Sequence, residues 1–218
     1  SYYFNHVSHA TTPVIFLATG IFAIVITGIN RLDINKDIME PGSGTGGYLI
    51  WAETAIPFKG DLREKRIRDQ LDLSDQQLDD LGFVQLWRSE GDDASCLNLN
   101  FIAAPPVLGV DPDIFSERNA FSASSVARGV DRDDPWKKLK DPPDDDVIYG
   151  IADQTVLEWG LKIRTGDTLF IRSENGRPLG IVMASGLKSS VFQGNVIIGL
   201  ENFRKYFPST GGSSFMLV

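Results

Sequence analysis

The side chains that most often do enzymatic chemistry are scarce in this chain. It has one cysteine, Cys96, and two histidines, His6 and His9. A cysteine nucleophile normally needs a base or a cation beside it, and both histidines lie ahead of a long apolar segment, far along the chain from Cys96. The same scarcity argues against a Ser–His–acid triad. A single cysteine also excludes an internal disulfide and a cysteine-based zinc site, so we expect Cys96 to be a buried structural residue.

Three other stretches contain residue types that can bind ligands. Asp141 and Asp144–Asp146 can offer oxygens to Ca²⁺, but they lack the D-x-[DN]-x-[DN]-G spacing and are more typical of a solvated acidic loop. Gly42–Gly47 has no lysine, so it predicts a flexible loop and no phosphate cradle. Asp92 and Asp93 point in opposite directions on an extended chain and do not indicate a glycosidase pair. The residues therefore predict no catalytic side chain, no cofactor and no bound metal.

Composition narrows the class of protein further. The 218 residues are 42% hydrophobic and 23% charged, which is ordinary for a globular protein of one large or two small domains. A net charge of −8 argues against nucleic-acid binding, which needs a basic face. The chain begins without Met and stops inside the apolar run Phe215–Val218. We therefore expect it to be part of a longer protein.

The first 30 residues contain no Lys, Arg, Asp or Glu. Within them, Pro13–Ile29 is almost wholly apolar, and as a helix it would be about 26 Å long, just short of a bilayer core. Pro13 would lie in the first turn, where a helix tolerates proline. Two alternatives remain open. The segment can form two buried strands that turn at Gly20, or it can be a cleaved signal peptide, although it has no basic region.

The remainder of the chain predicts short strands mixed with short helices. The Asn175-Gly176 pair indicates a β-hairpin, and Asp111-Pro112 predicts a helix start. Arg128–Asp146, with three prolines, predicts a solvated excursion or an internal boundary. The other expected strands are Tyr48–Ala52, Phe83–Trp87, Leu97–Phe101, Val147–Ile151, Thr168–Arg172, Leu179–Ala184, Val196–Ile198 and Phe215–Val218. The other expected helices are two within Asp61–Leu81, one from Asp153 to Trp159 that ends at Gly160, and one over Glu201–Phe207. We expect an α+β fold with a mixed or antiparallel sheet and short helices.

The order of several short motifs resembles one family of membrane proteins. These motifs are Gly46-Gly47-Tyr48, Trp51-Ala52-Glu53, Asp92–Leu99, Leu108-Gly109-Val110, Ile148–Leu161, Gly166–Leu169, Ala184–Leu187 and Ser190–Ile198. Taken in this order, they resemble the extracytoplasmic domain of MacB/FtsX-like ABC transporter permeases, known as the MacB-like periplasmic core domain. The resemblance covers most of residues 12–218. Residues 1–12 depart from the expected pattern, because a cytoplasmic flank usually carries Lys or Arg.

The resemblance implies a division of the chain. Residues 1–30 would be a flank and a transmembrane helix, and residues 31–218 an extracytoplasmic α+β domain at the bacterial inner membrane. Residues 53–146 would form an inserted subdomain, with Tyr48–Ala52 joining the sheet of Val147–Val218. The domain would not be an enzyme. ATP hydrolysis would belong to a separate ABC ATPase subunit, whose motion the domain would couple to export or extraction of a substrate, or to a periplasmic partner.

The same resemblance implies the partners of the chain. They are the ATPase subunit, a second copy of the permease or a homologous permease, the membrane, and a transported substrate or a periplasmic partner protein. A loop between two apolar strands is a candidate contact surface, and its residues are Ser189, Ser190, Phe192, Gln193, Gly194 and Asn195. Two rival functions remain: a soluble periplasmic or secreted hydrolase whose apolar start is buried as strands, and a binding or adhesion module anchored by one helix.

Overall fold

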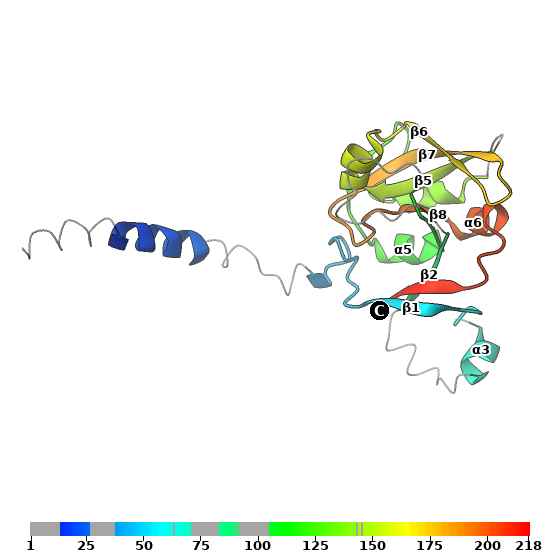
Figure 1. Cartoon of the computed structure of the whole chain (residues 1–218), viewed down its shortest axis with the longest axis horizontal. Helices are drawn as coiled ribbons and strands as arrows, with labels where there is room; N and C mark the ends of the chain where they lie inside the picture. The colour runs from blue at the N-terminus through cyan, green and yellow to red at the C-terminus, as the bar shows by residue number, and fades with distance from the viewer. Residues whose placement is uncertain are drawn as a thin grey trace, which may run out of the picture. The chain divides into compact units, whose positions relative to one another are not determined.

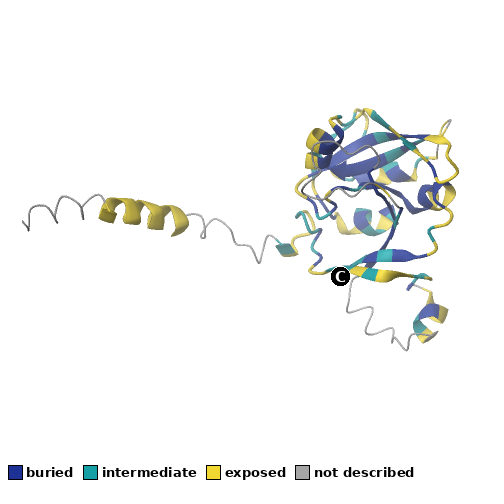
Figure 2. Ribbon diagram, in the orientation of Figure 1, coloured by how far each residue is buried: buried dark blue, intermediate teal, exposed yellow. Residues whose placement is uncertain are grey.

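The chain divides into two units, Ser1–Asp37 and Ile38–Val218, in a computed structural model of all 218 residues (Figure 1). The residues that the structure describes are 14–26, 38–62, 64–70, 83–89, 91, 105–142, 144 and 146–218. In the first unit, residues 14–26 form a helix whose described side chains are all exposed (Figure 2). The alternative of two buried strands is therefore wrong for this part of the segment. Among the described helices, none has both the length and the apolar character of a membrane span.

The second unit is built on a mixed sheet. Within the described residues, nine strands are arranged in the order β1-β9-β2-β3-β8-β5-β7-β4, and β6 also pairs with β7. The strands are β1 (Trp51–Phe58), β2 (Val84–Arg88), β3 (Val107–Val110), β4 (Ala123–Val126), β5 (Val147–Asp153), β6 (Thr168–Arg172), β7 (Pro178–Leu187), β8 (Val196–Gly199) and β9 (Ser213–Leu217). The β3–β8 and β5–β7 pairs are parallel, and the other pairs are antiparallel. The predicted α+β class with a mixed sheet is confirmed.

Short helices connect these strands. They are the α-helices α3 (Lys65–Gln70), α5 (Pro112–Arg118) and α6 (Leu200–Tyr206), the 3₁₀ helix η1 (Pro135–Lys140) and the π-helix η2 (Val156–Leu161). The predicted start of α5 is confirmed, since the Asp111 carboxylate accepts a hydrogen bond from the Asp113 amide at 3.2 Å. The helix expected to end at Gly160 continues to Leu161, and Lys162 follows it in the left-handed conformation.

Several predicted strands are confirmed, and others lie outside the described residues. The β6–β7 hairpin turns through Asn175-Gly176, where Gly176 has a φ of 74°. Trp51 and Ala52 pair with Leu217 and Met216, so the segment near residue 50 does join the sheet of the C-terminal strands. The expected strand at Leu97–Phe101 and the helix expected after Ser74 fall outside the described residues.

The inserted subdomain over residues 53–146 stays a prediction. In the part of this segment that the structure describes, β2, β3 and β4 pair with β9, β8 and β7. These strands therefore extend the same sheet that the C-terminal third builds.

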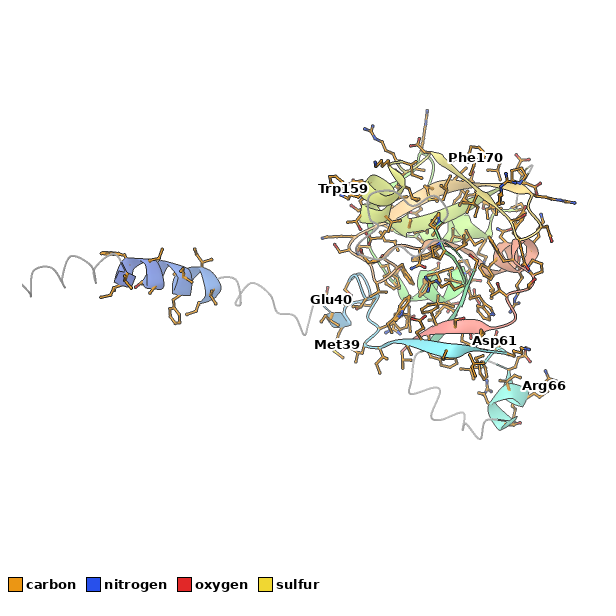
Figure 3. The ribbon with its side chains drawn as sticks, in the orientation of Figure 1. Met39, Glu40, Asp61, Arg66, Trp159 and Phe170 are labelled. Atoms are coloured by element: carbon orange, nitrogen blue, oxygen red, sulfur yellow. The ribbon has the colours of Figure 1, made fainter. Side chains whose placement is uncertain are left out.

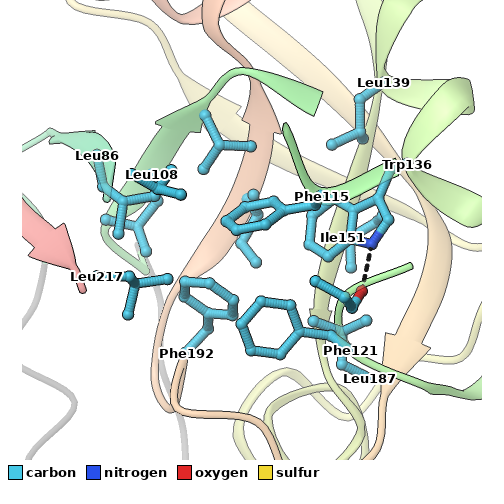
Figure 4. Packing of buried hydrophobic residues seen from close by; sticks show 14 of the residues in the cluster. Leu86, Leu108, Phe115, Phe121, Trp136, Leu139, Ile151, Leu187, Phe192 and Leu217 are labelled. Carbon is cyan, nitrogen blue, oxygen red and sulfur yellow. Dashed lines mark hydrogen bonds between the residues drawn. The ribbon is translucent and has the colours of Figure 1, made fainter. Parts of the chain in front are cut away.

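The Pro- and Asp-rich segment Arg128–Asp146 is expected from the sequence to be a solvated excursion or an internal boundary. The structure corrects this expectation. Its middle forms η1, and the side chains of Trp136 and Leu139 are each only 1% exposed. The Trp136 indole nitrogen donates a hydrogen bond to the Ala120 carbonyl oxygen at 2.8 Å (Figure 4). The segment is thus an anchored part of the core with a polar exterior. The many acidic residues around these two apolar side chains mask this role in the sequence.

Aromatic rings fill one face of the sheet. Phe115, Phe121, Trp136 and Phe192 come from four separate stretches of chain and meet in one cluster (Figure 4). Ring centroids lie 4.7 Å apart for Phe115 and Trp136 and 4.9 Å apart for Phe121 and Phe192. A second apolar cluster, to which Ile148 of β5 belongs, lies on the opposite face. With both faces covered, the central strands are apolar on both sides, as β5 shows in its sequence.

The glycine-rich stretch Gly42–Gly47 is packed against the core, which corrects the expectation of a flexible loop. The Val191 amide donates to the Gly44 carbonyl oxygen at 2.9 Å. A Cβ atom at Gly44 would lie 2.0 Å from the Ser189 carbonyl oxygen. Glycine is therefore needed at residue 44 because another backbone approaches it too closely for any side chain.

We expect Gly44→Ala to lower the free energy of unfolding by about 2–3 kcal/mol, because the new methyl group must displace backbone at Ser189. Urea denaturation followed by circular dichroism measures the change. Gly211→Ala is the matched control, since its Cβ would meet no atom closer than 3.8 Å. A Gly44→Ala variant as stable as the control would contradict this packing.

Candidate functional site

The predicted contact loop is only partly exposed. Ser189 and Gln193 are exposed and Asn195 is half-buried, whereas Ser190, Phe192 and Gly194 are buried. Phe192 is 0% exposed and belongs to the aromatic cluster. In this structure Ser190, Phe192 and Gly194 are thus inaccessible to a partner, so the expectation that they form a contact surface is corrected. Contact through Ser189 and Gln193 stays a prediction.

A fully buried carboxylate holds this loop in place. Asp153, at the end of β5, accepts hydrogen bonds from the Thr155 amide at 2.9 Å and from the Thr155 hydroxyl at 2.5 Å. Its other oxygen accepts from the Ser190 amide at 2.5 Å and from the Ser190 hydroxyl at 2.9 Å. Four donors around one carboxylate offset the cost of burying its charge. Asp153 therefore caps the turn into η2, as its sequence position predicts, and also fixes the loop that follows β7.

Asp153→Ala should destabilise the protein by about 3 kcal/mol, because the buried Ser190 amide would be left without an acceptor and the Thr155 amide would lose its own. Chemical denaturation at neutral pH tests this. Asp133→Ala, at an exposed aspartate, provides the control and should change stability by less than about 0.5 kcal/mol. Equal stability of the two variants would contradict the role given to Asp153.

A cavity lies where β3 and β8 end. The two strands are parallel, and their last residues, Val110 and Gly199, are partners in the register. Helices α5 and α6 follow directly, and the end of η1 forms a third wall. The cavity has a volume of about 450 Å³. Its lining residues are Asp111, Pro112, Asp113, Leu139, Lys140, Asp141, Pro142, Gly199, Leu200, Glu201, Asn202 and Arg204.

Acidic side chains outnumber basic ones around this cavity, which is named the β3–β8 cavity. Four lining side chains are acidic and two are basic. The Lys140 ammonium group lies 2.8 and 3.0 Å from the two carboxylate oxygens of Asp113. This hydrogen bond and the attraction of Asp113, aided by Asp111 and Glu201, raise the pKa of Lys140. The hydrogen bond and charge of Asp141 likewise raise the pKa of Lys138. Lys140 therefore stays protonated, and the acidic lining side chains still outnumber the basic ones.

Asp134 joins η1 to α5 beside this region. Its carboxylate accepts a hydrogen bond from the Ser116 hydroxyl and lies 3.0 Å from the Lys137 ammonium nitrogen. Burial by itself would raise the pKa of Asp134, but the hydrogen bonds from Ser116 and Lys137 and the charge of Lys137 outweigh it. The pKa of Asp134 thus lies below its ordinary value.

Asp134→Asn should lower stability by about 1–2 kcal/mol at pH 7, because it removes a charged acceptor. A lowered folded-state pKa means that the ionised carboxylate stabilises the protein above the unfolded-state value of about 3.8. This contribution is lost as the pH falls through the lower folded-state pKa. The difference between Asp134→Asn and wild type should therefore shrink below about pH 4 in a denaturation series. Asp133→Asn makes the same change at an exposed aspartate and is the matched control.

The remaining candidate residues either lie outside the described residues or pair with neighbouring side chains. Cys96, His6, His9, Asp92 and Asp93 lie outside the described residues. In the acidic loop, Asp141 pairs with Lys138, and the Asp146 carboxylate accepts from the Tyr206 hydroxyl at 3.1 Å. Where the structure describes the chain, no three His, Cys, Asp or Glu side chains are grouped so that they could hold a metal ion. Calcium binding by the acidic loop thus remains without support from the described residues.

Sequence reasoning missed the β3–β8 cavity. Asp111 was recognised only as a helix cap, and Glu201 and Asn202 only as part of a helical turn. A signal was present, because Asp111 directly follows β3 and Glu201 lies two residues after the end of β8. This signal could not be used, since nothing local shows that two strands so far apart in the chain run parallel to each other.

Two exposed apolar side chains, Trp159 and Phe170, were also not singled out, and both lie at the end of the unit that carries β6 (Figure 3).

No family model matches the chain, and no curated protein matches it either.

Proposed function

We propose that this chain is the extracytoplasmic domain, with its membrane-anchoring segment, of a MacB/FtsX-like ABC transporter permease in a bacterial inner membrane. The observation that carries the proposal is the helix over residues 14–26. Its large apolar side chains are all exposed, and two of them, Phe16 and Ile24, are each 74% exposed. No Lys, Arg, Asp or Glu occurs anywhere in the first 30 residues. Such a helix needs an apolar environment, and a bilayer provides one.

The second unit supports a role in transmitting motion. Its sheet is covered on both faces by apolar clusters, and its connecting loops are tied to the core at Asp153 and Trp136. A rigid body of this kind can pass a displacement of membrane helices on to a substrate or a partner. The assignment to the MacB/FtsX-like permeases in particular rests on the ordered sequence motifs that resemble this family. ATP hydrolysis is assigned to a separate ABC ATPase, and the domain itself is non-catalytic.

Contact with a periplasmic partner, a second permease copy or a substrate would use exposed side chains. In the predicted loop these are Ser189 and Gln193. Trp159 and Phe170, 69% and 72% exposed, are further candidates. A partner that covers such apolar side chains gains the free energy of removing them from water.

Membrane anchoring is tested by carbonate extraction of bacterial membranes. The chain 1–218 should remain in the pellet. The double substitution Ile21→Glu with Ile24→Glu should release it, because each charge near the middle of a membrane helix costs about 2.5–3.5 kcal/mol on insertion scales. Ile56→Glu with Phe170→Glu is the matched control, since it adds the same charge to exposed apolar residues of the second unit. If carbonate extracts the wild-type chain as readily as the double-Glu helix variant, the proposal of membrane anchoring is wrong.

The transporter assignment needs a separate test. The protein, purified from its native membranes in mild detergent, should bring an ABC ATPase with it in constant proportion. An anchored protein that brings no ATPase would instead favour the binding or adhesion module. A chain that is soluble, and whose fragment 31–218 unfolds, would favour the soluble hydrolase.

A further inference from the structure

We propose that an exposed apolar surface of the second unit contacts the interfacial layer of a phospholipid bilayer. This surface is made by Met39, Leu49 and Ile50 and is named the junction patch. The inference rests on the proposed membrane anchoring and adds to it a second point of contact with the membrane.

The junction patch gathers three exposed apolar side chains in one place. Met39, Leu49 and Ile50 are 61%, 62% and 56% exposed. The two stretches of chain that carry them touch, because a Cβ atom at Gly47 would lie only 3.1 Å from the Met39 carbonyl oxygen. Single exposed apolar side chains are ordinary on a protein surface, whereas a group of them indicates a surface that something covers.

Hydrogen bonds hold the backbone beneath the patch. The Ile38 carbonyl oxygen accepts a hydrogen bond from the Thr45 hydroxyl at 2.7 Å. The Leu49 and Ile50 amides both donate to the Val218 carbonyl oxygen, at 2.8 and 2.9 Å. The apolar side chains therefore project from backbone that is tied to the rest of the second unit.

The course of the chain favours a bilayer as the covering of this patch. Residues 27–37, eleven in all, separate the helix over residues 14–26 from Ile38, which precedes Met39. A chain of this length spans at most about 40 Å. A helix anchored in a bilayer thus acts as a short tether, which makes contact of the patch with the bilayer intramolecular and raises the effective concentration of lipid beside it.

The charges at the patch favour an apolar contact over an electrostatic one. The exposed Glu40 follows Met39 in the chain. The exposed Arg118 donates a hydrogen bond to the Gly47 carbonyl oxygen at 3.2 Å. Because these two charges are opposite, they give the patch little net attraction for anionic lipid. The contact therefore depends on removal of apolar side chains from water.

The test uses the full 218-residue chain in vesicles of phosphatidylethanolamine and phosphatidylglycerol. Each variant carries Cys96→Ala and one new cysteine that holds an environment-sensitive NBD label. With Leu49→Cys we expect blue-shifted emission and at least about two-fold quenching by acyl-brominated lipid, because interfacial apolar groups lie about 5–10 Å into the bilayer. Phe170→Cys, at an exposed apolar side chain far from Met39 (Figure 3), is the control and should emit as in water without quenching.

A label on the apolar helix separates failure of the patch from failure of the anchor. Phe16→Cys reports anchoring itself and should be quenched. Quenching at Phe16→Cys without quenching at Leu49→Cys overturns the junction patch and leaves anchoring intact. Absence of quenching at both contradicts the proposed anchoring, and this inference with it. A blue shift at Leu49→Cys that brominated lipid does not quench, and that grows with protein density, indicates a second copy and overturns the bilayer as the occupant.

A second measurement needs no change at Cys96. Photo-reactive benzoylphenylalanine at residue 49 of the otherwise native chain should crosslink to lipid on illumination, and the same group at residue 170 should not. Equal lipid crosslinking at the two residues would contradict a specific contact.

A variant of the patch identifies the side chains responsible. With the label at Met39→Cys, the further changes Leu49→Asp and Ile50→Asp should abolish most of the quenching, because charged groups resist transfer from water. Trp159→Asp with Phe170→Asp adds the same charge outside the patch and should leave the quenching unchanged. The quenching at Met39→Cys should also persist between about 20 and about 300 mM salt, since screening weakens only ionic contacts. Undiminished quenching in the Leu49→Asp, Ile50→Asp variant would show that the junction patch does not make the contact.

Discussion

The buried carboxylate of Asp153 is the interaction on which the arrangement of the second unit depends most. Its four donors come from Thr155, which begins the turn into η2, and from Ser190, which follows β7. β5 and β7 are parallel neighbours, and Asp153 and Leu187 are partners at their ends. One side chain therefore fixes where both strands stop and where both connections leave the sheet. Because Asp153 and Ser190 are both buried, water could not replace the carboxylate as the acceptor for the Ser190 amide.

The parallel pairing of β3 with β8 has a different consequence. It places two helix starts, separated by almost ninety residues of chain, side by side at the carboxyl ends of two central strands. η1 then closes the space between them, held by Trp136 in the aromatic core. The result is a cavity whose acidic side chains lie at the starts of α5 and α6 and beside the end of η1.

The two units differ in whether their apolar side chains are covered. The second unit buries its apolar side chains in two clusters, whereas the helix over residues 14–26 exposes every one of the side chains described for it. Water is a poor solvent for such a helix, so the covering must come from a bilayer or from protein. This contrast gives the anchoring proposal its physical basis, and membrane extraction of the helix variants decides it.

Sequence alone determined the features that depend on neighbouring residues. The Asn175-Gly176 turn, the cap of α5 at Asp111 and the alternation of short strands and helices follow from local backbone preferences, which tertiary packing did not override. Tertiary structure alone decided what depends on residues far apart in the chain. It placed Trp136 and Phe192 in the core although polar residues surround them, and it made Gly44 a close backbone contact. It also joined α5, α6 and η1 around one cavity. The physical reason is that burial and strand pairing are set by long-range contacts, which no local pattern encodes.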